Sequence, residues 1–215
     1  MGIQLYKVMH TLESLEALAR WQTGGRAGQG TEIALLEAQL MQEYCWMTEV
    51  ELHRALEDKK RAYDSPQHLG GMDMAMDRLA VPYRFIMLST KLDKGSRMRV
   101  RTAYGLSEFF NRLRGLVQGG EDSPGKWVMF DDPFCTKMEE LESEGFGAVM
   151  EVPFCAPVNS CGKSFVDDKS YMARNHAGLV QLFVWAEKYN GFTGTEMKPP
   201  KGGVQSLVPK GKGSA

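Results

Sequence analysis

The sequence lacks the segments that take a chain to or across a membrane. No apolar run approaches the roughly 20 residues that a membrane-spanning helix needs. A secretion signal begins with a basic region followed by an apolar one, and residues 1–4 do not begin such a pattern. We therefore expect an intracellular protein without a membrane partner, and the sequence does not specify its compartment.

Cysteine is scarce and positive charge is not in excess. The four cysteines are scattered, without CxxC spacing or a nearby histidine, so we expect reduced thiols rather than disulfides or a zinc site. They are Cys45, Cys135, Cys155 and Cys161. The formal net charge is −1, so any basic surface must be local. With 215 residues, 43% of them hydrophobic, the chain is long enough for one large domain or two small ones.

An apolar run that ends in two adjacent carboxylates, residues 164–168, is the most informative stretch. Unpaired carboxylates are costly in a core, whereas hard cations such as Mg²⁺ take oxygen ligands. Successive residues of a flat strand point to opposite faces, so Asp167 and Asp168 can serve one site only at a tight turn. The alternative interpretation is a solvated turn.

Hydrophobic periodicity predicts helices that alternate with strands. The predicted helices span residues 3–20, 31–49, 66–79, 82–93, 127–141 and 173–190, and the predicted strands lie near 52–57, 97–102, 148–154 and 163–166. We expect the last two strands to form a hairpin. The second helix is expected to bury Ile33, Leu36, Leu40, Met41 and Trp46.

Two stretches contain arginines in positions that suit phosphate. Residues 22–31 form a loop with four glycines and Arg26 before a predicted helix, although glycine loops usually only turn the chain. Arg97, Arg99 and Arg101 alternate along a predicted strand, which suits either a phosphate backbone or a solvated sheet face.

Three motifs, in this order, resemble the reverse transcriptase domain of non-LTR retrotransposons and group II introns. The first is residues 58–65, an aspartate followed after three residues by Ala, an aromatic, Asp and Ser. The second is the Gly-x-x-Gln-Gly turn of residues 115–119, which leads to Ser-Pro at 123–124. The third is residues 165–168, an aromatic, any residue and two aspartates. The resemblance covers roughly residues 5–198.

This resemblance implies an α+β fold, in which a polymerase palm of antiparallel sheet and packed helices joins mostly helical fingers. It makes Asp58, Asp167 and Asp168 the catalytic, metal-binding triad for Mg²⁺ or Mn²⁺, with Asp168 the least direct. Two cations about 3.5–4 Å apart would serve nucleotidyl transfer. Three close carboxylates repel one another and would take up protons, so they stay ionised only when bound cations neutralise them.

The resemblance also assigns residues that contact substrate. Tyr63 matches the aromatic that lies under the sugar and favours deoxynucleotides, and Gln118 and Gly119 match the turn that contacts the incoming nucleotide. Arg26 lies where the fingers place a basic residue near triphosphate or template. Lys198 matches a late lysine that can act as the acid for pyrophosphate departure. Read singly, these residues are better explained without a function: Tyr63 as a core aromatic, Gln118 as a turn residue and Lys198 as a tail charge.

The sequence departs from the family pattern at several places. The strand before Asp58 contains His53, Arg54 and Glu57 where a central strand is expected to be apolar, and Lys59 replaces an aliphatic residue. Gly194 stands where the family often has asparagine. Only 17 residues follow Lys198, so we expect a domain of residues 1–198, truncated before the thumb, and a disordered Lys-, Gly- and Pro-rich tail at 199–215.

The function that these motifs predict is RNA-directed DNA synthesis by a retroelement domain. Its partners would be an RNA template, a DNA primer and deoxynucleotides. The departures motivate the alternative of a catalytically inactive remnant that at most binds nucleic acid. An RNA-dependent RNA polymerase is a third option, against which Tyr63 argues. Protein partners are not indicated.

Overall fold

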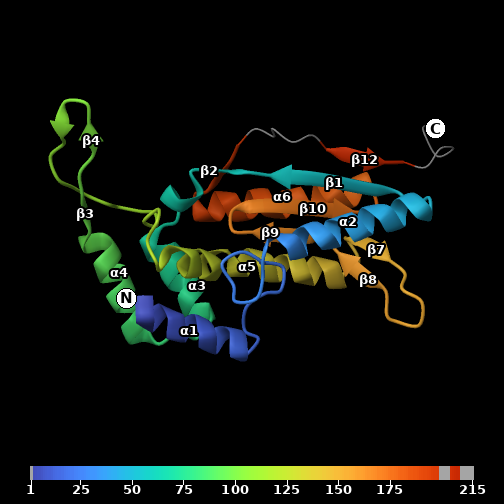
Figure 1. Ribbon diagram of the computed structural model, residues 1–215, viewed down its shortest axis with the longest axis horizontal. Coiled ribbons are helices and arrows are strands. Elements are labelled where there is room, and N and C mark those ends of the chain that lie inside the picture. Colours follow the sequence, from blue (N-terminus) through green and yellow to red (C-terminus); the bar gives the residue numbers. More distant parts are fainter. Residues whose placement is uncertain (1, 199–203, 209–215) are drawn as a thin grey trace.

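The computed structural model describes residues 2–198 and 204–208, and it has the mixed α and β character that the sequence predicts (Figure 1). The helices are α1 (Gly2–Ser14), α2 (Thr31–Met47), α3 (Asp73–Arg78), α4 (Tyr83–Gly95), α5 (Ser123–Ser143) and α6 (His176–Thr193), with short helical turns at Ala62–Asp64 and His68–Met72. Within the described part of the chain, no helix is long and apolar enough to span a membrane.

A four-stranded antiparallel sheet forms the centre of the fold. Its strands lie in the order β12 (Gln205–Leu207), β1 (Leu52–Glu57), β10 (Asp168–Ala173) and β9 (Gly162–Phe165). In the register of β1 with β10, Ala55 lies opposite Tyr171 and Glu57 opposite Lys169. The strand before Asp58 is therefore internal to the sheet, as the family resemblance requires.

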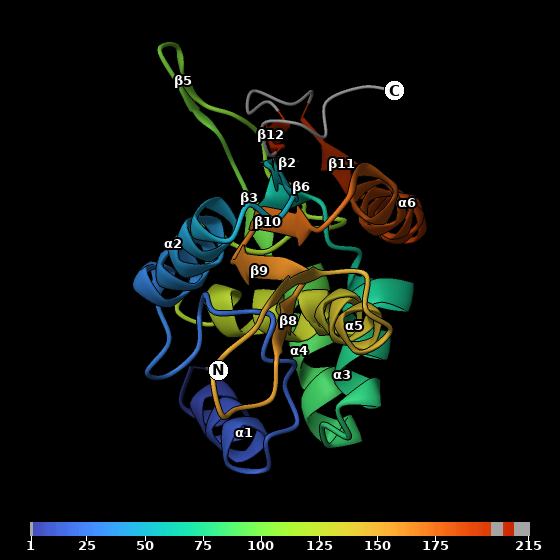
Figure 2. The same cartoon turned by 90° about the vertical axis from the view of Figure 1, so that its right-hand side faces the viewer.

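Helices cover the two faces of this sheet unequally. In Figure 2, α5 and α6 lie on one side of β9 and β10, and α2 lies on the other. Side chains alternate along the strands, so Ala55, Tyr171 and Ala173 pack in one cluster with residues of α5 and α6. On the α2 side, Leu52 and Met172 pack against Ala38, Met41 and Cys45.

Helix α5 joins two parts of the core. Its first half, with Trp127 and Phe130, packs against α1, α3 and α4. Its second half, with Phe134 and Met138, belongs to the cluster with α6 and the sheet. This helix is buried along nearly its whole length because it has neighbours on both sides.

The strand pairing differs from the prediction in two places. The hairpin that contains Asp167 consists of β9 and β10, whereas β7 (Ala148–Met150) pairs with β8 (Val158–Ser160) and not with residues 163–166. Part of the predicted disordered tail forms β12, which pairs with β1, so that expectation is corrected for residues 205–207. Residues 199–203 and 209–215 of that tail lie outside the described residues.

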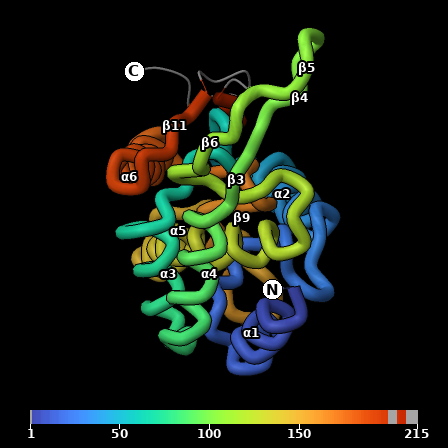
Figure 3. Tube along the Cα trace, turned by 90° about the vertical axis from the view of Figure 1, so that its left-hand side faces the viewer, coloured from blue at the N-terminus to red at the C-terminus, as the bar shows by residue number. Residues whose placement is uncertain are grey.

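A ribbon between α4 and α5 projects from the body of the molecule in Figures 1 and 3. It contains β3 (Arg97–Met98), β4 (Arg101–Thr102), β5 (Gly105–Leu106) and β6 (Phe110–Asn111). β3 pairs with β6 and β4 pairs with β5. The single strand predicted for residues 97–102 is thus one side of a longer hairpin.

Smaller strand pairs complete the fold. β2 (Lys59–Lys60) follows β1 directly and pairs with β11 (Glu196–Met197) after α6. This pairing brings the segment after Asp58 beside the segment before Lys198.

Candidate functional site

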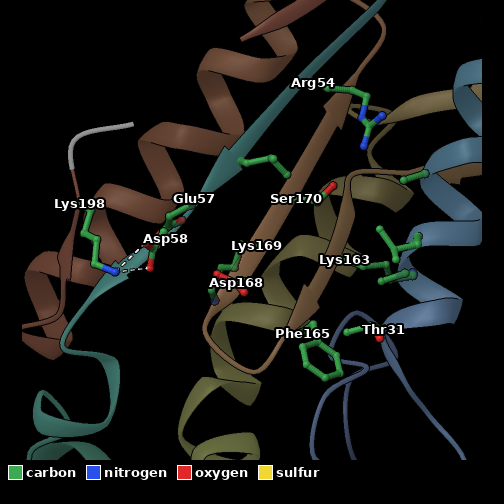
Figure 4. Close-up of a pocket in the computed structure, with 14 residues that line it drawn as sticks. Thr31, Arg54, Glu57, Asp58, Lys163, Phe165, Asp168, Lys169, Ser170 and Lys198 are labelled. Carbon is green, nitrogen blue, oxygen red and sulfur yellow. Dashed lines mark hydrogen bonds and ion pairs between the residues drawn. The ribbon is translucent and has the colours of Figure 1, made fainter. Parts of the chain in front are cut away.

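The strands bring two of the three predicted acids, Asp58 and Asp168, to the same face of the sheet. Side chains alternate along β10, so Asp168 and Ser170 point to the α2 side of the sheet and the intervening Lys169 points to the α5 and α6 side. Asp58 follows β1 on the same α2 side. Asp58 and Asp168 line one cavity of about 440 Å³ between the sheet and α2 (Figure 4).

The turn that contains Asp167 is held from two directions. Val166 has a left-handed φ of +58°, which closes the tight turn between β9 and β10. The side-chain oxygen of Gln22 accepts a hydrogen bond from the Val166 N–H at 3.0 Å, and Trp127 donates its indole N–H to the Val166 carbonyl at 2.6 Å. Gly24 packs so closely that a Cβ there would lie 2.4 Å from the Val166 nitrogen. The aspartate pair therefore lies at a tight turn, as the sequence analysis required.

The three acids influence one another electrostatically. Burial raises the pKa of the Asp167 carboxyl above its ordinary value, and the charges of Asp168 and Asp58 raise it further. Burial and the charge of Asp58 likewise raise the pKa of Asp168, and Lys198 opposes both shifts. The arrangement is a cluster of negative charge that favours cations.

Lys198 already supplies one positive charge to this cluster. Its ammonium group donates to both carboxylate oxygens of Asp58, at 2.8 and 2.6 Å, and its backbone N–H donates to the Asp58 carbonyl at 2.9 Å (Figure 4). Both side chains are about two-fifths exposed, so the ion pair is accessible to solvent. The structure thus places Lys198 beside the first acid of the motif set.

Carboxylate oxygens suit Mg²⁺ or Mn²⁺, and this part of the expected metal site is present. Among the described residues, however, no three His, Cys, Asp or Glu side chains lie close enough together to hold a metal ion as they stand. Asp58 is also paired with Lys198. The donor set fits a hard cation in chemistry, and binding would require Lys198 to release Asp58 and the carboxylates to converge.

Tyr63 lies near Asp167 and packs against α5. Its ring stacks on Trp127, with centroids 5.6 Å apart and an interplanar angle of 24°. Burial, and then the charge of Asp167, raises the pKa of the Tyr63 hydroxyl. The tyrosine is therefore both half-buried and close to Asp167, a position compatible with either a core role or a sugar contact.

Gln118 and Gly119 lie in an exposed turn just before α5. Gly119 has a φ of +79°, a conformation in which a side chain would be strained. No hydrogen bond joins Gln118 to any of the three acids, so its contact with a nucleotide stays a prediction.

Arg26 has a different role from the one that the sequence suggested. Its guanidinium donates to Glu13 at 2.8 and 2.6 Å and to the carbonyls of Ala19 and Gln22 at 2.6 and 3.3 Å. The side chain is only 7% exposed. All three guanidinium nitrogens are engaged within the protein, so in this structure Arg26 joins α1 to the glycine loop and is not free to bind triphosphate.

A buried charge network lies beneath the acids, on the opposite face of β1 and β10. Lys169 donates to both oxygens of Asp131 on α5 at 2.7 Å, and both side chains are fully buried. Lys59 pairs with Glu57 at 3.1 Å. Tyr171 donates its hydroxyl proton to Glu57.

The network accounts for the polar residues around Asp58. Burial alone would raise the pKa of Glu57, but Lys59, Lys169 and Tyr171 more than offset it and hold that pKa below its ordinary value. Burial lowers the pKa of Lys59, and repulsion from Lys169 lowers it further. Glu57 and Lys59, two of the residues that depart from the family pattern, are therefore paired with each other inside the fold.

Two cations of the cavity wall were not identified as site residues. Arg54 of β1 and Lys163 of β9 line the same cavity as Asp58 and Asp168 (Figure 4). The apolar side chains of Leu35, Leu56 and Phe165 complete this part of the wall. Strand alternation gives the signal for Arg54, because it lies four residues before Asp58 on the same face. Lys163 becomes apparent only once β9 is known to pair with β10.

Comparisons with known proteins agree with this geometry at the level of the fold. No protein-family model matches the sequence, and no curated protein is significantly similar to it. Solved structures of telomerase, a reverse transcriptase relative, are similar to the chain. The mixed fold with its antiparallel sheet is therefore a reverse-transcriptase-like fold.

Among these neighbours are telomerases of two Candida species. Apo telomerase of Candida tropicalis has a TM-score of 0.69 at 12% identity, over 100% of this chain and 38% of that one. Candida tropicalis telomerase with a fragment of telomeric RNA has a TM-score of 0.67 at 12% identity, over 98% of this chain and 34% of that one. The Candida albicans complex gives 0.63 at 13% identity, over 95% and 34%. The chain thus spans little more than a third of these proteins.

Proposed function

We propose that the chain is the RNA-directed DNA polymerase domain of a retroelement, which transfers deoxynucleotides onto a primer 3′-hydroxyl. The observation that carries the proposal is that Asp58 and Asp168 line one cavity, on the α2 side of a reverse-transcriptase-like sheet. Asp167 lies within electrostatic range of both. In this proposal the sheet with α5 and α6 is the palm, and the N-terminal helices belong to the fingers.

The chemistry of the site supports a divalent cation as cofactor. Asp58, Asp167 and Asp168 would hold Mg²⁺ or Mn²⁺, which when bound would lower the pKa of the primer hydroxyl and neutralise charge on the leaving pyrophosphate. Lys198 would leave Asp58 and could then donate a proton to that pyrophosphate. Its semi-exposed position allows this movement.

Other residues of the chain would orient the substrates. The cavity contains Arg54 and Lys163, whose charges suit phosphate, and apolar side chains that suit bases and sugars. Tyr63 would lie under the incoming sugar and exclude a 2′-hydroxyl, and Gln118 and Gly119 would contact the same nucleotide. A ribonucleotide preference would instead favour an RNA-dependent RNA polymerase.

Primer extension on an RNA template tests the proposal. We expect the wild-type chain to incorporate deoxynucleotides with Mg²⁺ or Mn²⁺, and the double variant Asp167→Ala, Asp168→Ala to lose incorporation. The variant Asp77→Asn, which changes an exposed acid of α3, is the matched control and should keep it. Equal incorporation by wild type and the double variant would refute the assignment.

A second function, nucleic-acid binding without catalysis, is favoured by the Lys198–Asp58 ion pair, which occupies an acid that catalysis needs. Under this alternative the purified chain binds an RNA–DNA hybrid but never extends it, even with Mn²⁺. Extension by wild type would exclude it.

A further inference from the structure

The ribbon between α4 and α5 has a composition unlike that of the rest of the chain. We define the arm as residues 97–114. It contains five arginines and one glutamate, whereas the whole chain has a formal net charge of −1. Positive charge is therefore concentrated in the one segment that projects from the body (Figure 3).

The arm has no core of its own. Every residue from Arg97 to Asn111 is exposed, although the segment includes large apolar side chains. Tyr104 at the tip is fully exposed, and Phe109 and Phe110 are 52% and 47% exposed. A two-stranded ribbon without a packed face is only marginally stable in water, so a partner that covers these side chains would add stability.

An arginine and an aromatic ring stack on each other across the arm. Arg97 pairs with Asn111 and Met98 with Phe110 across the strands, which places Arg99 opposite Phe109. The Arg99 guanidinium lies 3.9 Å from the centre of the Phe109 ring. Rings and guanidinium planes of this kind stack on unpaired bases, while the exposed Arg97 and Arg101 can contact phosphates.

The base of the arm is fixed beside the candidate site. Arg112 donates to Asp93 of α4 at 2.9 Å, and Lys126 of α5 contacts the same carboxylate at 2.8 Å. After the arm, Leu116 donates its N–H to the Tyr63 carbonyl at 2.5 Å. Gly115 has a φ of +90° and would place a Cβ 2.9 Å from the Tyr63 carbonyl oxygen, so only glycine suits this connection.

We infer that the arm binds single-stranded nucleic acid. Exposed rings favour unpaired bases over a duplex, whose stacked bases offer no free faces, and the charge favours nucleic acid over an ordinary protein surface. Binding by the arm does not require catalysis. Its more specific role, to hold the unpaired template beside Tyr63, rests on the proposed function.

Fluorescence anisotropy with the full chain tests the inference. The probes are a labelled single-stranded RNA of about 20 nucleotides, longer than the roughly 4–16 nucleotides that one binding module covers, and a duplex of the same length. We expect wild type to prefer the single strand.

Two arm variants separate the contributions of charge and stacking. The triple variant Arg97→Gln, Arg99→Gln, Arg101→Gln should bind about tenfold or more weakly. The slope of log affinity against log salt should fall by about 1.4, because the phosphate contacts of Arg97 and Arg101 contribute about 0.7 each. The double variant Tyr104→Ala, Phe110→Ala should also bind about tenfold more weakly, with an unchanged salt slope.

A charge-matched control changes three exposed cations outside the arm, Lys7, Arg20 and Lys188, to glutamine. We expect it to bind within about twofold of wild type. Because the arm lies outside the core, the arm variants should keep the wild-type melting temperature.

The inference is overturned if the arm variants bind like wild type, if the control loses as much affinity, if wild type prefers the duplex, or if the arm variants alter only self-association in size-exclusion chromatography. Primer extension measured in parallel distinguishes the two proposals. If the chain extends primers but the arm variants bind as wild type does, only the inference about the arm is refuted. If binding depends on the arm but no primer is extended, only the proposed polymerase function is refuted.

Discussion

The buried ion pair beneath the acids gives the sharpest stability prediction. Lys169 and Asp131 join β10 to α5, and neither side chain has any exposed surface. The substitution Asp131→Asn keeps the size of the side chain, so no cavity forms, but it leaves the lysine without its counter-ion.

The expected cost is about 3–5 kcal/mol of the free energy of unfolding, the usual consequence of leaving one partner of a buried pair uncompensated. It is large relative to the 5–15 kcal/mol by which domains are stable. The nearby Glu57 carboxylate does not replace Asp131, because it already pairs with Lys59, and Lys169 otherwise faces the Phe134 ring at 3.6 Å. The double replacement Asp131→Leu, Lys169→Met should recover most of the loss, since it removes both charges together.

Urea denaturation followed by tryptophan fluorescence measures these effects. The control variant Glu196→Gln breaks an ion pair with Lys60 that is exposed at both partners, and it should leave stability unchanged within error. The reasoning is refuted if Asp131→Asn costs no more than this control, or if the double replacement is less stable than the single one.

Three other predictions follow from local geometry. Burial raises the pKa of Glu142 above 4.5, so the charged form is disfavoured in the folded state; Glu142→Gln should stabilise the protein at neutral pH, and the gain should shrink as the pH falls through the folded pKa, as thermal melts across pH would measure. Lys198→Ala should free Asp58 and tighten Mn²⁺ binding up to about fivefold in electron paramagnetic resonance titrations, and weaker binding would contradict this. Gly162→Ala should cost more than about 2 kcal/mol in denaturant melts, because φ is +114° and the new Cβ would lie 1.8 Å from a carbonyl oxygen of β10; the same change at Gly95, where nothing lies within 4 Å, should not destabilise.

The sequence predicted helices better than it predicted what they bury. Helix α2 forms at Thr31–Met47, close to its predicted range of 31–49. Met41 is buried as expected, but Leu36 and Trp46 are 57% and 73% exposed, while Ala38 and Cys45 face the sheet. Periodicity identifies a helix and its apolar residues, yet it does not determine which side another element approaches when apolar residues surround the helix.

Strand partners were harder to predict because pairing depends on contacts distant in sequence. Ala148–Met150 and Lys163–Val166 both have strand character, and their proximity suggested a hairpin. The tight turn at Val166 instead folds β9 onto β10, and β7 pairs with β8. The pairing of β12 with β1 joins segments about 150 residues apart and has no local signal.

The site was predicted in part. The ordered motifs predicted that three acids meet, and the structure places them within electrostatic range of one another; their role as metal ligands stays a prediction. The ion pair of Arg26 could not be predicted, because its partner Glu13 lies on the preceding helix α1 while Arg26 lies in the loop. Glu57 and Lys59 looked like defects in the strand, since their partners Tyr171 and Asn190 lie far along the chain.

Incorporation of a single deoxynucleotide by Asp58→Asn tests the central claim most directly. This isosteric change removes the charge that β1 contributes to the cluster and spares the turn at Asp167. With saturating Mg²⁺ and a primed RNA template, we predict a loss of at least about a hundredfold in rate relative to wild type, while the exposed-acid control Asp77→Asn stays near wild type. Equal rates for Asp58→Asn and Asp77→Asn would contradict the account.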